Sequence, residues 1–225
     1  MAQVVLVHGF WADGSSWSDV AVELDRAGHR VVAVQLPLSS FADDVACVRR
    51  ALDRAGGPVV LVGHSYGGVV ISEAASGRSD VSALVYVSAY GPDKGEDVTA
   101  LNDTYPPAGA GRAIRPTQDG HLWLDDDLFA PDFAADVEPA RARAMALTQG
   151  PASVACLTGL TVDPAWKTIP SWFVISTQDR TIAPDAQRFM AQRMGATTVE
   201  VEGSHAALVS RPHEIASVII SAAAR

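Results

Sequence analysis

A serine lies between two glycines in the segment GHSYG at 63–67, which fits the pattern G-x-S-x-G. Apolar residues precede it at 59–62 and a mostly apolar run follows it at 69–75, so the sequence predicts a strand, a sharp turn and a helix. A serine hydroxyl becomes a good nucleophile only when a base removes its proton. On such a turn the Ser65 hydroxyl projects beyond the sheet, where a base and a substrate can both reach it.

Two downstream residues supply the base and the orienting acid that a serine nucleophile needs. Asp179 comes two residues after a predicted strand at 171–177, and His205 follows a predicted strand at 197–201. The order serine, acid, histidine and the placement beyond strand ends both fit a catalytic triad. Ser65 is expected to attack a carbonyl carbon and His205 to move its proton. Asp179 is expected to hold the imidazole in the required tautomer.

Other acids and histidines compete for these roles. Asp93 follows the fourth predicted strand and is the main alternative to Asp179, because an acid there could also reach the base. His8 and His64 flank the predicted site and are expected to shape it through hydrogen bonds. The other candidate acids are Asp163 and Asp185. Among the other histidines, His29 and His213 are expected at the surface, and the role of His121 stays open.

A negative charge that develops on a carbonyl oxygen needs backbone N–H donors, which together form an oxyanion hole. Tyr66, the residue after the nucleophile, is one expected donor, and Phe10, in the loop after the first strand, is the other, with Trp11 as second choice. The loop could instead be an ordinary glycine turn with two core aromatics. The candidate substrate contacts are Phe10, Trp11, Tyr90, Trp123 and Trp166, although packing is as good an explanation for the tryptophans of the 91–167 segment.

Strands and helices alternate strictly through residues 1–90, with predicted strands at 4–7, 31–34, 59–62 and 81–87. The strands at 171–177 and 197–201 then complete a mostly parallel six-stranded sheet with helices on both faces. In such α/β sheets the site lies at the carboxyl ends of the strands. His8, Ser65 and Tyr90 all fall at such ends.

The segment 91–167 interrupts this alternation and contains no strong strand. We expect it to be an inserted, largely helical cap, with a helix at 139–149 and turns at Gly91-Pro92 and Pro106-Pro107. The core would then be 1–90 and 168–225. An acidic stretch from Asp119 to Glu138 holds seven acidic residues and no Lys or Arg, which indicates a solvated face.

Composition excludes several classes of protein. The chain has 225 residues, 48% of them hydrophobic, and a net charge of -9, so nothing in it favours nucleic acid or an anionic membrane as a partner. Cys47 and Cys156 are far apart in sequence and are expected to be reduced thiols. No metal-ligand spacing, signal peptide or membrane span is evident. These features predict a cytoplasmic protein without metal or cofactor.

With these residues in hand, the chain resembles the α/β-hydrolase superfamily, and within it the small-lid group of plant methyl esterases, hydroxynitrile lyases and bacterial esterases. The motifs that carry the resemblance are VLVHG at 5–9, GHSYGG at 63–68, Thr177-x-Asp179 with Pro184 and Asp185, and Gly203-Ser204-His205 with Ser210-x-Pro212. The lyases of this group carry a threonine at the place of Gly9 and a lysine at that of Ala206. The resemblance therefore favours the esterases.

The sequence predicts a serine hydrolase of the carboxylesterase type that cleaves esters of small to medium apolar or aromatic substrates through an acyl-enzyme. A small-molecule binding protein of the same fold is the alternative. Lyase, perhydrolase or cofactor-free oxygenase chemistry on the same site also stays open. A homodimer is compatible with the sequence.

Overall fold

The computed structural model describes residues 1–105 and 109–224, so the predicted Pro106-Pro107 turn lies outside the described residues. Its main sheet has six strands in the order β2-β1-β3-β4-β8-β9, and every pairing in it is parallel. The six-stranded α/β sheet predicted from the sequence is therefore confirmed. The strands are β1 (Gln3–Val7), β2 (Arg30–Ala33), β3 (Val59–His64), β4 (Val81–Val87), β8 (Ser171–Ser176) and β9 (Thr197–Val201).

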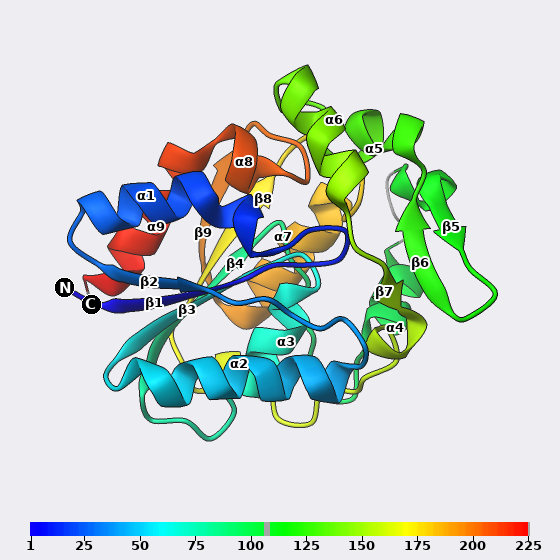
Figure 1. Cartoon of the computed structure of the whole chain (residues 1–225). Helices are drawn as coiled ribbons and strands as arrows, with labels where there is room; N and C mark the ends of the chain where they lie inside the picture. The colour runs from blue at the N-terminus through cyan, green and yellow to red at the C-terminus, as the bar shows by residue number, and fades with distance from the viewer. Residues whose placement is uncertain (106–108, 225) are drawn as a thin grey trace.

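The central strands are continuous apolar runs because helices cover both faces of the sheet. All six residues of β3 and all six of β8 are buried. Figure 1 shows α1 and α9 on one face and α2 and α3 on the other, and α7 packs beside β8. The bounds are α1 (Ser18–Arg26), α2 (Phe41–Ala55), α3 (Gly67–Ala74), α7 (Pro184–Met194), α8 (Ala207–Ser210) and α9 (Pro212–Ala223).

Local chemistry sets the ends of α2. The Ser40 side chain accepts a hydrogen bond from the Asp43 N–H at the N-terminus, and Gly56 ends the helix in the left-handed conformation at φ 67°. Val45, Val48 and Leu52 recur at helical spacing and are buried. The side that these residues form is buried, and α2 packs against α3 and β1.

The segment after β4 lies across the carboxyl ends of the strands, opposite the N-terminus of the chain (Figure 1). It contains α4 (Val98–Thr104), α5 (Asp126–Phe133) and α6 (Pro139–Thr148), with short 3-10 turns at Ala110–Ala113, Val154–Cys156 and Ala165–Lys167. We call residues 91–167 the cap, a division that stays a prediction.

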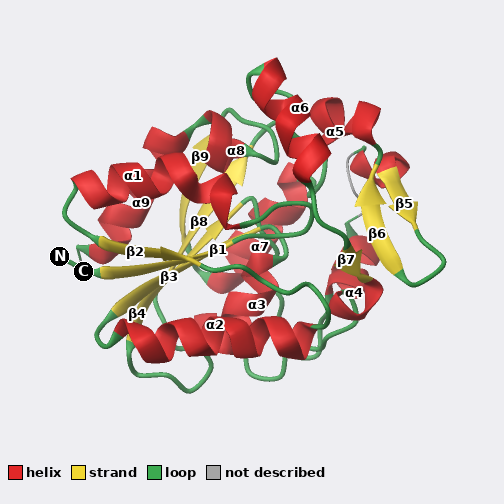
Figure 2. Ribbon diagram, in the orientation of Figure 1, coloured by secondary structure: helices red, strands yellow, loops and turns green. Residues whose placement is uncertain are grey.

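The cap shows no strong strand in the sequence, yet it is not helical throughout. Three short strands, β5 (Ile114–Pro116), β6 (His121–Leu124) and β7 (Ala152–Ser153), form an antiparallel sheet in the order β5-β6-β7 (Figure 2). They have three, four and two residues, which is too short for a periodic pattern in the sequence. Burial of Leu122 and Leu124 against the core holds β6 in place.

The acidic stretch is not wholly a solvated face. Asp132 is buried and forms ion pairs with Arg112 and Arg180. The hydrogen bond and charge of Arg112, with Arg180 adding to them, hold the pKa of Asp132 below its ordinary value. These partners lie far from Asp132 in sequence, so the run of acidic residues could not reveal them.

Both cysteines are free thiols, as expected. Within the described residues no helix combines the length and the apolar character needed to cross a bilayer.

Candidate active site

Ser65 occupies a strained turn between β3 and α3. Its φ is +55°, a left-handed conformation that costs a residue other than glycine about 1–3 kcal/mol. A Cβ on Gly63 would lie 2.6 Å from the Gly67 carbonyl oxygen, and one on Gly67 would lie 2.7 Å from the Val7 carbonyl oxygen. Both glycines are therefore required by close backbone contacts, and the turn presents Ser65 at the end of the sheet.

His205 and Asp179, which the sequence predicts to be the base and its orienting acid, are in contact in the structure. His205 Nδ1 and Asp179 Oδ2 are 2.8 Å apart, and both side chains are fully buried. The His205 Nε2 atom is buried and makes no hydrogen bond within the described part of the chain. The His205 ring lies 4.7 Å, centroid to centroid, from that of His64, the neighbour of Ser65. The imidazole thus has one nitrogen fixed by a carboxylate and the other open beside the serine turn.

The competing acids lie elsewhere. Asp93 forms an ion pair with Lys167, Asp185 with Arg188, and Asp163 accepts a hydrogen bond from Ser76. Asp179 is the acid that contacts the candidate base.

Asp179 is held by residues that the sequence reasoning missed. Its Oδ1 accepts hydrogen bonds from the N–H groups of Thr181 and Ile182, at 2.7 and 2.9 Å. Its Oδ2 accepts one from Gln187 Nε2, at 2.8 Å. Gln187 is fully buried, donates also to the Ile182 carbonyl, and accepts from the Ser176 N–H. The signal for it was present, because Gln187 falls on the buried stripe of α7 with Ala186, Met190, Ala191 and Met194.

Gln187→Leu is expected to lower kcat about tenfold, because one hydrogen bond that orients the acid is lost. Turnover of a p-nitrophenyl ester at saturating concentration measures kcat in the variant and in the wild type.

Gln192→Leu is the matched control, because Gln192 is exposed on the same helix. Its kcat should equal that of the wild type. A kcat for Gln187→Leu that equals that of the wild type would exclude a positioning role for Gln187.

His8 and His64 form hydrogen bonds that shape the site, as expected. His64 Nε2 donates to the His205 carbonyl at 2.9 Å, which fixes the loop that carries the base. His8 Nε2 accepts from the Leu36 N–H at 2.9 Å, so its Nδ1 donates to the Gly9 carbonyl at 2.8 Å. Burial lowers the pKa of both side chains, that of His64 strongly. Both are therefore neutral at pH 7.

Of the two expected oxyanion donors, Tyr66 follows Ser65 in the chain and Phe10 follows Gly9 in the loop after β1. A Cβ on Gly9 would lie 2.6 Å from Ser65 Cβ and 3.1 Å from its Oγ, so the loop after β1 runs directly against the nucleophile. Neither the Phe10 nor the Tyr66 N–H donates a hydrogen bond among the described residues. The two aromatic rings stack at 4.4 Å. Both amides are free to bind an anionic oxygen.

A buried acid, Asp44, supports Tyr66. Its Oδ2 accepts a hydrogen bond from the Tyr66 hydroxyl at 2.9 Å, and its Oδ1 accepts one from the Leu38 N–H at 2.9 Å. Burial raises the pKa of Asp44 despite these donors. Burial, with the Asp44 charge, raises the pKa of the nearby Cys156 thiol to about 12, so this thiol is unreactive. In the sequence Asp44 looks like an ordinary acid in the first turn of a helix.

A cavity of about 80 Å³ opens at Ser65. Its walls are mostly apolar, and three of the predicted substrate contacts, Phe10, Trp11 and Tyr90, are among its lining residues. The lining residues are Phe10, Trp11, Ser65, Tyr66, Tyr90, Val98, Asn102, Ala110, Gly111, Ile114, Leu122, Leu157 and Thr181. The other two predicted contacts, Trp123 and Trp166, are not among them. Trp123 pairs with Arg115 across the cap sheet, and the Trp166 indole donates to the Pro92 carbonyl.

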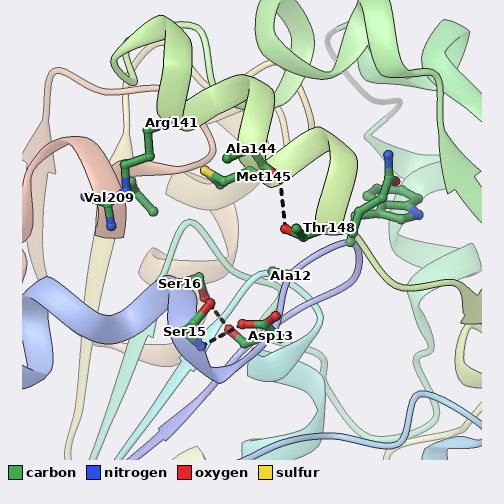
Figure 3. A pocket seen from close by; sticks show the side chains of 11 residues that line it. Ala12, Asp13, Ser15, Ser16, Arg141, Ala144, Met145, Thr148 and Val209 are labelled. Atoms are coloured by element: carbon green, nitrogen blue, oxygen red, sulfur yellow. Dashed lines mark hydrogen bonds between the residues drawn. The ribbon is translucent and has the colours of Figure 1, made fainter.

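A second cavity, of about 170 Å³, lies on the other side of the loop after β1. Figure 3 shows Asp13, Ser15 and Ser16 of that loop facing Met145 and Thr148 of α6. Trp11 lines both cavities, and its indole donates to the Leu122 carbonyl at 3.0 Å. Ser65 does not line the second cavity, so it is not the catalytic one.

The cap is tied to the loops that carry the acid and the base. Arg180, next to Asp179, pairs with Asp132 of α5. The Phe133 carbonyl accepts from the Ala206 N–H, and the Phe133 ring lies 4.8 Å from that of His205. Asp136 accepts from the Ser204 N–H. Residues 132–136 therefore help to position both members of the pair.

The described residues contain no group of three or more His, Cys, Asp or Glu side chains arranged to hold a metal ion. The chemistry that the arrangement supports is proton transfer and nucleophilic attack.

Comparisons with known proteins agree with this geometry. Residues 4–218 match the model of the alpha/beta hydrolase family. A carbendazim-hydrolyzing esterase of Nocardioides sp. is 37% identical over 118 residues, which are 45% of this chain and 47% of that protein. Methylesterase 7 of Arabidopsis thaliana is 25% identical over 97% of this chain and 95% of that protein.

Among solved structures, a pyrethroid hydrolase from Sphingobium faniae superimposes with a TM-score of 0.84 at 24% identity, over 99% of this chain and 98% of that one. At this identity the likeness shows the fold. The match to the family model, together with the relatives, shows that this chain belongs to the alpha/beta hydrolase family and groups with its esterases.

Proposed function

We propose that the protein hydrolyses carboxylic esters through an acyl-enzyme formed on Ser65. The observation that supports the proposal most directly is the hydrogen bonding of the two ring nitrogens of His205. Its Nδ1 is held by Asp179 at 2.8 Å, and its Nε2 is buried and unpartnered among the described residues, beside the serine turn. An imidazole fixed in this way is a general base for a neighbouring hydroxyl.

In the first half of the reaction His205 Nε2 takes the Ser65 proton while the serine oxygen attacks the ester carbon. The Phe10 and Tyr66 N–H groups stabilise the anionic oxygen that forms. The carbon–oxygen bond to the alcohol then breaks, and His205 gives its proton to the departing alcohol. In the second half water attacks the acyl-enzyme by the same proton route, which releases the acid and restores Ser65.

The cavity supports a small to medium apolar or aromatic substrate. Its lining includes Phe10, Val98, Ile114 and Leu122, and its volume of about 80 Å³ excludes a bulky group on that side of the serine. The names of two relatives, a methylesterase and a carbendazim-hydrolyzing esterase, support ester hydrolysis.

The test is turnover of p-nitrophenyl esters of increasing acyl length by the wild type and by Ser65→Ala. We expect multiple turnover by the wild type and a loss on the order of 10³-fold or more in the variant, because the nucleophile is absent. Intact-mass analysis after rapid acid quench should show the acyl group on the wild type and not on Ser65→Ala. Folded wild type that binds esters but turns none over would contradict hydrolysis and favour a binding protein.

A further inference from the structure

The cavity at Ser65 contains one side-chain amide, that of Asn102 in α4 of the cap. Most of the wall around it is apolar. Outside the serine turn and Tyr90, the other polar side chains of the lining are Thr181, whose hydroxyl donates to the Asp132 carbonyl at 3.3 Å, and Trp11, whose indole donates to the Leu122 carbonyl at 3.0 Å. Among the described residues, Asn102 is therefore the polar side chain that the cap presents to a bound molecule.

Tyr90 fixes which end of this amide is available. The Tyr90 hydroxyl donates to Asn102 Oδ1 at 2.8 Å. Tyr90 is buried, and burial raises the pKa of its phenol, so the hydroxyl keeps its proton and remains a donor. The amide oxygen is thereby occupied, while Asn102 Nδ2 makes no hydrogen bond among the described residues. Its two N–H groups are left for a ligand.

We propose that the substrate carries a second hydrogen-bond acceptor, such as a ketone, ether or further ester carbonyl, which the Asn102 amide N–H groups bind. This inference rests on the proposed ester hydrolysis. The donors at Phe10 and Tyr66 serve the carbonyl that is cleaved, so the acceptor bound by Asn102 belongs to the part of the substrate that fills the cavity. Asn102 is half-buried, and a bound substrate without an acceptor would cover its amide N–H groups and leave them unpaired beside an apolar wall, which is unfavourable.

Pairs of esters that differ by one carbonyl test this assignment. Methyl 4-oxopentanoate is compared with methyl pentanoate for an acceptor in the acyl group, and 4-oxopentyl acetate with pentyl acetate for one in the alcohol. The readout is the ratio of kcat/KM for the oxo ester to that for its plain partner. We expect a ratio about fivefold higher in the wild type than in Asn102→Leu for at least one pair.

Asn102→Asp separates recognition from packing. It keeps an oxygen acceptor for the Tyr90 hydroxyl but replaces the N–H donors with acceptor oxygens, so the ratio should fall at least as far as in Asn102→Leu. Asp103→Ala is the matched control, because Asp103 is exposed on the same helix and does not line the cavity. It should leave the ratio within about twofold of the wild type. Equal ratios in the wild type, Asn102→Leu and Asn102→Asp for both pairs would overturn the inference.

Measurements of ester binding distinguish a failure of the Asn102 assignment from a failure of the proposed ester hydrolysis. Ser65→Ala cannot form the acyl-enzyme, and Trp11 in the cavity wall provides a fluorescence signal for intact esters. If the wild type turns over no ester, yet Ser65→Ala prefers the oxo ester and Ser65→Ala/Asn102→Asp does not, the hydrolytic proposal fails and the Asn102 site stands. If binding shows no such preference, the Asn102 site fails whatever the turnover.

Discussion

Asp179→Asn is expected to lower kcat by about four orders of magnitude while the protein stays folded. In the wild type Asp179 Oδ2 receives two hydrogen bonds, from His205 Nδ1 and Gln187 Nε2. The amide oxygen of the variant could still accept from the Thr181 and Ile182 N–H groups. Its new NH₂ group would then point toward His205 Nδ1 and Gln187 Nε2. His205 would then lose the proton on Nδ1 and carry it on Nε2, where it cannot accept a proton from Ser65.

Turnover of a p-nitrophenyl ester, with far-ultraviolet circular dichroism to confirm folding, measures this effect. Asp93→Asn is the control, because Asp93 was the main alternative acid and pairs with Lys167 instead. Its kcat should stay within about twofold of the wild type, as for a surface ion pair. A large loss in Asp93→Asn together with an active Asp179→Asn would reverse the assignment of the acid.

Gly68→Ala is expected to lower the free energy of unfolding by about 3 kcal/mol. A Cβ at this position would overlap the Tyr90 carbonyl oxygen and lie 2.9 Å from Ala89 Cβ. The neighbour is backbone at the end of β4, which cannot move aside without disturbing the sheet. Alanine is a better helix former than glycine by about 1 kcal/mol, so the close contact outweighs the gain in helix propensity.

Chemical denaturation measures the loss. Gly57→Ala is the control, since a Cβ there would meet open space and the position has no positive φ. Its stability should change by no more than about 0.5 kcal/mol. Equal stability of Gly68→Ala and the wild type would mean that the backbone at Tyr90 is not packed as closely on α3 as described. Because Tyr90 lines the cavity, kcat/KM should fall in Gly68→Ala as well.

The ends of a helix or strand can be predicted closely from the sequence where residues within or next to that element determine them. Ser40 caps the N-terminus of α2, Pro184 and Pro212 begin α7 and α9, and Gly195 follows α7, and residues of these types mark helix ends in a sequence. The strands of the main sheet were equally clear, because parallel strands covered on both faces are continuous apolar runs. The pairing of Asp179 with His205 was also predictable. Both residues follow a strand end, and they come after Ser65 in the order acid, then histidine.

The rest depends on contacts between distant segments. Asp44 reaches Tyr66 across 22 positions, and Asp132 reaches Arg180 across 48. No pattern within one element encodes such pairs. Trp123 and Trp166 were expected at the cavity by residue type alone. Trp123 lies in β6 and pairs with β5, and Trp166 lies in the turn at Ala165–Lys167 and donates to the Pro92 carbonyl. Gln187 is intermediate, because its position on the apolar stripe of α7 was visible but its partner was not.

The attachment of residues 132–136 to the loops around Asp179 and His205 has a consequence for engineering by recombination. A cap transplanted from a relative would bring a new partner to Arg180 and a new carbonyl to the Ala206 N–H. Such a chimaera would inherit not only a different cavity but also a different alignment of acid and base. The exchangeable unit in this protein is therefore the cap together with positions 180 and 204–206.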